Sequence, residues 1–403
     1  MTELATVGAA LLVFHLVARL GVAPFAEYQV ARAAITSLGP ALVVGLAVAL
    51  PKYVSRAVAR DGGRAPDLLR TALLLGAGSI LCVAVAGTWF SGAVAQVVFG
   101  SADRSDLVVG IVVMACGVVA DGVTYGYVRG RLLDQTANLV RILNLGVSPL
   151  AAALLADDVV SLLVLAGSFM VLGSLVTLAV VAFRPRLPRV TAGTSGAMVR
   201  YALRRMPGDI ALAALLTLPT ILATHLVGIE EAGYVGFGTS VVALVVAFMA
   251  PVSYVLVPRL SHDLVRGGGQ LLETARWLPV FFAALAVCGV VALYFLMPLV
   301  VSRYLGPEFS GAVVVAREVM LSSIPLAVFM GGRSLIDALY ESARNSRNLI
   351  IAVLVEIAAT FAAVTVWSGA TGVAVGLFCG CSALAVLTGV AQWRIPRIET
   401  GRV

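Results

Sequence analysis

Twelve stretches of about 20 apolar residues follow one another along the chain, separated by short polar connections. The hydrocarbon core of a bilayer is about 30 Å thick, and a helix needs about 20 residues to cross it. We therefore predict an all-α polytopic membrane protein with twelve transmembrane helices. The predicted spans are residues 4–24, 26–50, 68–90, 106–128, 137–156, 159–183, 208–228, 233–257, 277–301, 310–331, 348–367 and 371–393.

An internal repeat divides these spans into two similar sets. The segment that follows Phe25 contains Tyr28, Pro51 and Arg60, and a second copy after Glu231 contains Tyr234, Pro258 and Arg266 in the same order. Repeats of this kind are typical of transporters that are built from two halves. The predicted organisation is a six-helix bundle at 1–183, a basic cytoplasmic linker at 184–205, a second six-helix bundle at 206–393 and a cytoplasmic tail at 394–403.

The basic residues fall on alternate connections. The formal net charge is +7, and 23 of the 28 lysines and arginines lie on connections that would share one side of the membrane. Basic connections face the cytoplasm in most membrane proteins. We therefore predict a multi-pass membrane protein with both termini in the cytoplasm. Membrane topology also explains the positive charge without a nucleic-acid partner.

Neither a metal centre nor a catalytic domain is expected. The five cysteines all lie inside apolar stretches, they form no CxxC pair, and no cluster of histidines accompanies them. The connections are too short to hold a soluble catalytic domain, and they contain no nucleophile, phosphate-binding or zinc motif. The sequence predicts a protein that is not an enzyme and has no cofactor.

Three arginines and one histidine within the spans are candidate substrate contacts. His15 and Arg19 lie four residues apart, hence on one face of the first span, and Arg32 and Arg317 lie near the predicted outer side of two other spans. A charged side chain within the bilayer is energetically costly and often marks a functional site. A guanidinium group can bind two phosphate oxygens at once. These residues predict a cationic cavity for a diphosphate. Snorkelling to the headgroups, or pairing with a local partner, is the alternative for each arginine.

Two buried acids and a second histidine are candidate ion- or proton-coupling sites. Asp121 falls in the inner half of the fourth span, Glu356 near the middle of the eleventh, and His225 near the outer end of the seventh. A carboxylate removed from water can exchange protons closer to neutral pH. The alternative is a hydrogen bond to a neighbouring helix.

Glycine recurs at every fourth position in two spans. This spacing lets two helices approach closely, so we expect tight packing along both stripes. The glycines are Gly122, Gly126 and Gly130 in the fourth span, and Gly372, Gly376 and Gly380 in the twelfth.

Three segments resemble bacterial oligosaccharide flippases of the O-antigen type. They are VARLGVAPFAEYQVARAAITSLGPALVVGLAVALPKYVSR, IEEAGYVGFGTSVVALVVAFMAPVSYVLVPRLS and LGPEFSGA. The superfamily also contains MATE-type multidrug exporters and the lipid II flippase. The resemblance implies two six-helix bundles around a central cavity that opens alternately to either side. It implies transfer of polyprenyl-diphosphate-linked oligosaccharides from the inner to the outer leaflet. Glycosyltransferases and a polysaccharide polymerase would act beside it, and Arg19 is the residue that the resemblance carries over.

Other functions stay open on the sequence. A cation-coupled multidrug exporter would line its cavity with acidic residues, and a lipid II flippase would usually have two further spans. A polysaccharide ligase or polymerase would need a large outer loop, whereas the longest outer connection here is roughly 91–105. A scaffold without transport would have no water-filled cavity between its helices.

Overall fold

The computed structural model describes residues 2–60, 65–182, 193–265, 270–339 and 344–393, and these residues form helices and no strands. They divide into two compact units, Met1–Ala213 and Ala214–Val403. The boundary lies inside the long helix α10 (Gly193–Leu226), whose first part belongs to unit 1. Residues 193–205 of the predicted linker form the first part of α10. Residues 184–192 lie outside the described residues.

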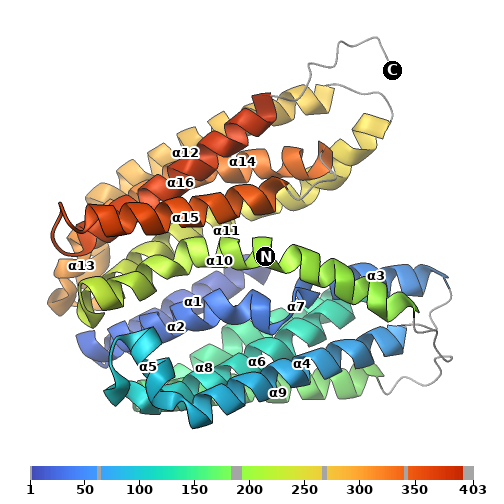
Figure 1. Ribbon diagram of the computed structural model, residues 1–403, viewed down its shortest axis with the longest axis horizontal. Helices are drawn as coiled ribbons and strands as arrows, with labels where there is room; N and C mark the ends of the chain where they lie inside the picture. The colour runs from blue at the N-terminus through green and yellow to red at the C-terminus, as the bar shows by residue number, and fades with distance from the viewer. Residues whose placement is uncertain (1, 61–64, 183–192, 266–269, 340–343, 394–403) are drawn as a thin grey trace. The chain divides into compact units, whose positions relative to one another are not determined.

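In unit 1 the other helices pack around α6 (Figure 1). Its elements in chain order are α1 (Thr2–Ala18), α2 (Val22–Leu42), α3 (Leu46–Arg60), α4 (Ala65–Trp89), α5 (Ser91–Phe99), η1 (Ala102–Arg104), α6 (Ser105–Gly130), α7 (Asp134–Ile142), η2 (Leu143–Val147), α8 (Ser148–Leu155), α9 (Val159–Ala182) and the first part of α10.

Unit 2 contains the remaining part of α10 and the helices that follow it. In chain order these are α11 (Ile229–Val265), α12 (Gln270–Val300), η3 (Val301–Leu305), η4 (Pro307–Phe309), α13 (Gly311–Val319), η5 (Met320–Ser322), α14 (Ser323–Leu339), α15 (Arg344–Ala363) and α16 (Ala370–Trp393). Helix α14 packs on α11, α12 and α16, and α15 lies along α16 (Figure 1).

Length and composition confirm the polytopic prediction. Among the described residues, 11 helical stretches are long and apolar enough to cross a bilayer, and the apolar helix Ala5–Ala18 is shorter. Large apolar side chains project from these helices, for example Leu74 on α4 and Phe295 on α12, which are 65% and 74% exposed. So much apolar surface is compatible with lipid and unfavourable in water.

The glycine stripe of α6 is closely packed, as predicted: Gly126 and Gly130 face α3, and Gly122 faces Val43 just before it. A Cβ atom on Gly122 would lie 2.9 Å from Val43, and one on Gly130 would lie 2.6 Å from Val54. A Cβ atom on Gly126 would meet Leu50 and Pro51 at 3.4 Å, which is closer to an ordinary contact. The stripe therefore lets α3 lie directly on α6, and the buried apolar residues of unit 1 gather around this contact.

The second predicted span is not one continuous helix. It is broken between α2 and α3, where Val44 and Gly45 both have positive φ angles of 52° and 65°. The freed amides are satisfied locally, since Gly45 N–H donates to the Pro40 carbonyl at 3.1 Å. A β-branched residue in this conformation is strained. A Cβ atom on Gly45 would collide with the Ala202 carbonyl, so the break lets α10 approach the backbone here.

Candidate functional site: polar groups within the membrane helices

Arg32 of α2 lies against an aromatic ring of α1. Its guanidinium carbon is 4.8 Å from the centroid of the Phe14 ring, and the Phe14 ring meets the Tyr28 ring edge-on at 6.1 Å. Arg32 therefore has a local partner, which the sequence analysis named as the alternative to a phosphate contact. This cation–π contact holds the Arg32 guanidinium group over the ring.

The other residues of the predicted phosphate site in unit 1 occupy different environments. Arg19 is exposed in the turn that follows α1, and His15 is half-buried within that helix. Gln29, one turn before Arg32 on α2, is 1% exposed, and neither its amide oxygen nor its amide nitrogen has a hydrogen-bond partner among the described residues. The sequence analysis missed Gln29 because a neutral amide carries no charge to mark it.

Arg317 of unit 2 is held by α12. Its Nε donates a hydrogen bond to the Tyr294 carbonyl at 2.9 Å, and its guanidinium carbon lies 4.3 Å from the centroid of the Tyr294 ring. The local partner that the sequence analysis named as an alternative is therefore found for Arg317. Its side chain is also partly exposed. A cavity lined jointly by Arg19, Arg32 and Arg317 stays a prediction.

Asp121 belongs to a buried polar cluster that joins three elements of unit 1. Asn144 on the π-helical turn η2 donates from Nδ2 to Asp121 Oδ1 at 2.9 Å and to Ser174 Oγ of α9 at 3.0 Å. All three side chains are buried, and Arg141 is close enough to interact electrostatically with the carboxylate. The hydrogen-bonded alternative for Asp121 is therefore realised. π-Helical turns are frequent at functional sites, so Asp121 also stays a candidate ion-coupling residue.

The approach of α9 to this cluster depends on a glycine. A Cβ atom on Gly173 would lie 2.7 Å from Asn144 Oδ1. A larger residue would displace the amide from Asp121 and Ser174. Sequence reasoning missed Asn144 and Ser174, although the neighbouring glycine and the charge of Asp121 are the signals that could have indicated them.

Glu356 and His225 differ in burial. Glu356 on α15 is 0% exposed, and neither carboxylate oxygen has a hydrogen-bond partner among the described residues. His225 is exposed in the last turn of α10. Of the predicted coupling candidates, only Asp121 and Glu356 are removed from solvent.

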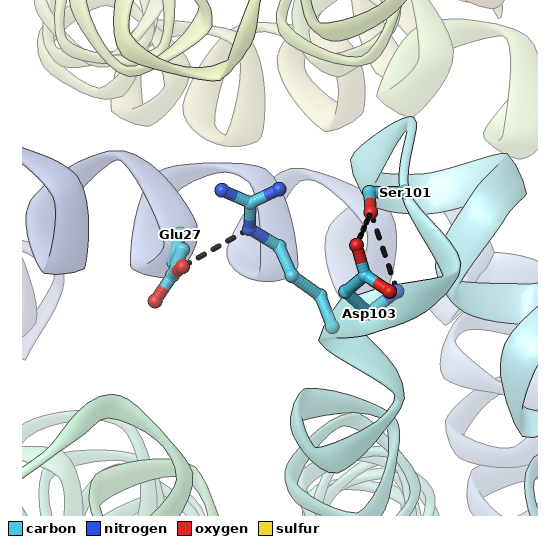
Figure 2. A network of polar contacts seen from close by, with 4 residues as sticks. Glu27, Ser101 and Asp103 are labelled. Atoms are coloured by element: carbon cyan, nitrogen blue, oxygen red, sulfur yellow. Dashed lines mark hydrogen bonds and ion pairs between the residues drawn. The ribbon is translucent and has the colours of Figure 1, made fainter.

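An ion pair joins α2 to the short helix η1. Arg104 Nε lies 3.0 Å from Glu27 Oε1 (Figure 2). Beside it, the Asp103 amide donates to Ser101 Oγ at 3.2 Å, and the hydroxyl donates to Asp103 Oδ2 at 3.2 Å. The pair ties the start of α2 to the corner that leads into α6.

Basic and aromatic side chains gather at the opposite end of unit 1, which we call the basic end. Lys52 Nζ lies 3.8 Å from the centroid of the Tyr201 ring, and the Tyr53 ring packs 6.0 Å from the same ring. Two guanidinium groups share Tyr125: Arg129 donates to its hydroxyl at 3.0 Å, and the Arg141 carbon lies 4.8 Å from its ring centroid. Such groups can bind lipid headgroups or other phosphates.

Comparison with known proteins decides the family. Residues 1–262 match the family described as "Polysaccharide biosynthesis protein". The chain belongs to this family. No curated protein matches it.

The fold is that of the MOP superfamily. An inward-facing multidrug resistance MATE transporter of that superfamily has a TM-score of 0.81 at 14% identity, with 99% of this chain and 96% of that chain covered. A MOP transporter from Pyrococcus furiosus, described as having a binding pocket of reversed polarity, has a TM-score of 0.66 at 14% identity, with 98% and 95% covered. The chain thus combines membership of a polysaccharide biosynthesis family with the fold of these solved transporters.

Proposed function

We propose that this protein is a flippase that transfers a polyprenyl-diphosphate-linked oligosaccharide from the inner to the outer leaflet of the bacterial cytoplasmic membrane. The observation that carries the proposal is the match of residues 1–262 to a polysaccharide biosynthesis family by a chain with a transporter fold. The sugar chain is too polar to cross lipid unaided, whereas the polyprenyl tail can remain in the bilayer. A membrane protein of this family therefore has to shelter the headgroup.

Arginine supplies the chemistry that the diphosphate requires. Arg19 is exposed, and Arg32 and Arg317 each lie on an aromatic ring that positions the guanidinium group. In the proposed mechanism these three residues and His15 bind the diphosphate while the two units open alternately to the inner and the outer leaflet. An ion gradient or the membrane potential drives the cycle, with Asp121, Glu356 and His225 as the candidate coupling groups.

The proposed orientation places both termini and the basic end of unit 1 in the cytoplasm. Lys52, Arg129 and Arg141 would then face the anionic inner leaflet, where their attraction to lipid phosphates is favourable. The substrate would be delivered by glycosyltransferases on that side, and a polysaccharide polymerase would receive it on the other.

Complementation of a flippase-deficient bacterial strain tests the proposal. The wild-type chain should restore surface polysaccharide, and Arg19→Ala should abolish restoration while the amount of membrane-inserted protein stays unchanged. Arg303→Ala serves as the control, because Arg303 is exposed on η3 and has no part in the proposed site. Full complementation by Arg19→Ala would remove this residue from the proposed site.

A cation-coupled multidrug exporter is the second candidate. Two observations favour it: similar solved structures are described as multidrug resistance transporters, and Asp121 and Glu356 are carboxylates buried within the helices. An exporter of organic cations would protect cells against cationic drugs and would leave surface polysaccharide unchanged. Measuring both phenotypes in one strain separates the two functions.

A further inference from the structure

Glu356 lies at a close contact between α15 and α16 of unit 2. A Cβ atom on Gly380 of α16 would lie 2.7 Å from Glu356 Cβ and 3.0 Å from the Ala352 carbonyl. One turn along, a Cβ atom on Gly376 would collide with Thr360 Oγ1. The glycine stripe of α16 thus serves, as predicted, for close packing, and it presses the α16 backbone against the acid.

Among the side chains that the structure describes, none pairs with this carboxyl group. The titratable side chain that faces it from α16 is the thiol of Cys381, which is itself fully buried. On its own helix the arginines Arg344 and Arg347 lie at least nine residues earlier, about 13 Å along the axis. From α14, the Arg333 carbonyl accepts from Asn345 near those arginines. Both carboxylate oxygens of Glu356 are buried without a hydrogen-bond donor from any residue that the structure describes.

The chemistry of the surroundings selects the ligand. An ionised carboxylate without a counter-charge is strongly unfavourable in a bilayer, so the group must hold a proton or a cation. A hard cation needs several oxygen ligands. The side-chain oxygen available beside Glu356 is Thr360 Oγ1, one turn further along α15, which also has no described partner. This set suits a proton and is too small for a metal ion.

We propose that Glu356 is a proton-binding carboxylic acid of unit 2. A hydronium ion donates its proton to one carboxylate oxygen and leaves as water, and release reverses this step. The inference assigns one of the coupling groups of the proposed function. The proton site itself requires no substrate, so its test is independent of the transport test.

Infrared difference spectroscopy of the full chain in lipid nanodiscs tests the site. The wild-type spectrum should contain the carbonyl band of a protonated carboxylic acid, and this band should be absent in Glu356→Gln. Glu230→Gln, which changes an exposed carboxylate, should leave the band unchanged. Absence of any band that depends on Glu356 would overturn the proposal. So would a band that appears only when sodium is removed, because it would identify a cation as the ligand.

Discussion

Arg104 and Glu27 form an ion pair 77 positions apart in the sequence, with Nε 3.0 Å from Oε1 (Figure 2). The pair holds η1 against the start of α2, the helix that carries Gln29 and Arg32. Both side chains keep partial access to solvent, so the pair has the character of a surface salt bridge more than of a buried one. Its main role is then to fix the position of α2 rather than to supply stability.

Neutralising this pair should have a small effect on stability. Glu27→Gln is expected to lower the free energy of unfolding by less than about 1 kcal/mol, since partly exposed ion pairs contribute little. Thermal unfolding of the purified protein at low and at high salt measures it, and the loss should be smaller at high salt. The exchanged pair Glu27→Arg with Arg104→Glu should recover most of the loss. A loss of several kcal/mol in the single variant would show a different role for Glu27.

Removing the amide that joins Asp121 to Ser174 should be more costly. Asn144→Ala leaves the carboxylate and the hydroxyl without their shared donor, and an unsatisfied buried polar group costs about 1–3 kcal/mol. Ser174→Ala removes only one of the two bonds and should cost less. The order of the unfolding temperatures, wild type above Ser174→Ala above Asn144→Ala, checks this prediction. Equal stability of all three proteins would contradict it.

Two glycines of one stripe provide a matched comparison of packing. Gly130→Ala should destabilise unit 1 by about 1–3 kcal/mol, because its Cβ would lie 2.6 Å from Val54 Cβ, whereas Gly126→Ala would make only near-ordinary contacts at 3.4 Å. Gly126 lies in the interior of α6 and Gly130 is its last residue, so part of the difference between their unfolding temperatures reflects helix propensity and the rest reflects the contact. Equal unfolding temperatures for the two variants would mean that α3 is not held closely against α6.

The apolar segments were enough to predict the helical class, because a span needs about 20 apolar residues and this requirement is visible in any sequence. Glycine spacing likewise predicted the close contacts of α6 and α16. The break at Val44 could not be foreseen, since a β-branched residue gives no sign of a positive φ angle and the conformation depends on the approach of Ala202. Asn144, Ser174 and Gln29 escaped notice because neutral polar groups become informative only when their burial and partners are known.

Cysteine labelling in intact cells tests the proposed orientation. A cysteine at Ser101 on the η1 corner should react with a membrane-impermeant reagent from outside. A cysteine at Ser195, in the first turn of α10, should react only after the cells are permeabilised. The asymmetric distribution of arginine predicts this result. The reversed pattern would invert the topology and with it the direction of transfer.

Reconstitution into lipid vesicles tests the central claim most directly. A polyprenyl-diphosphate oligosaccharide is placed in one leaflet, and its arrival in the other is measured by its accessibility to a sugar-modifying enzyme. The account predicts transfer by the wild-type protein, a severe loss in Arg32→Ala and near-normal transfer in Arg303→Ala. Transfer no faster than in protein-free vesicles, together with active movement of organic cations by the same preparation, would contradict it.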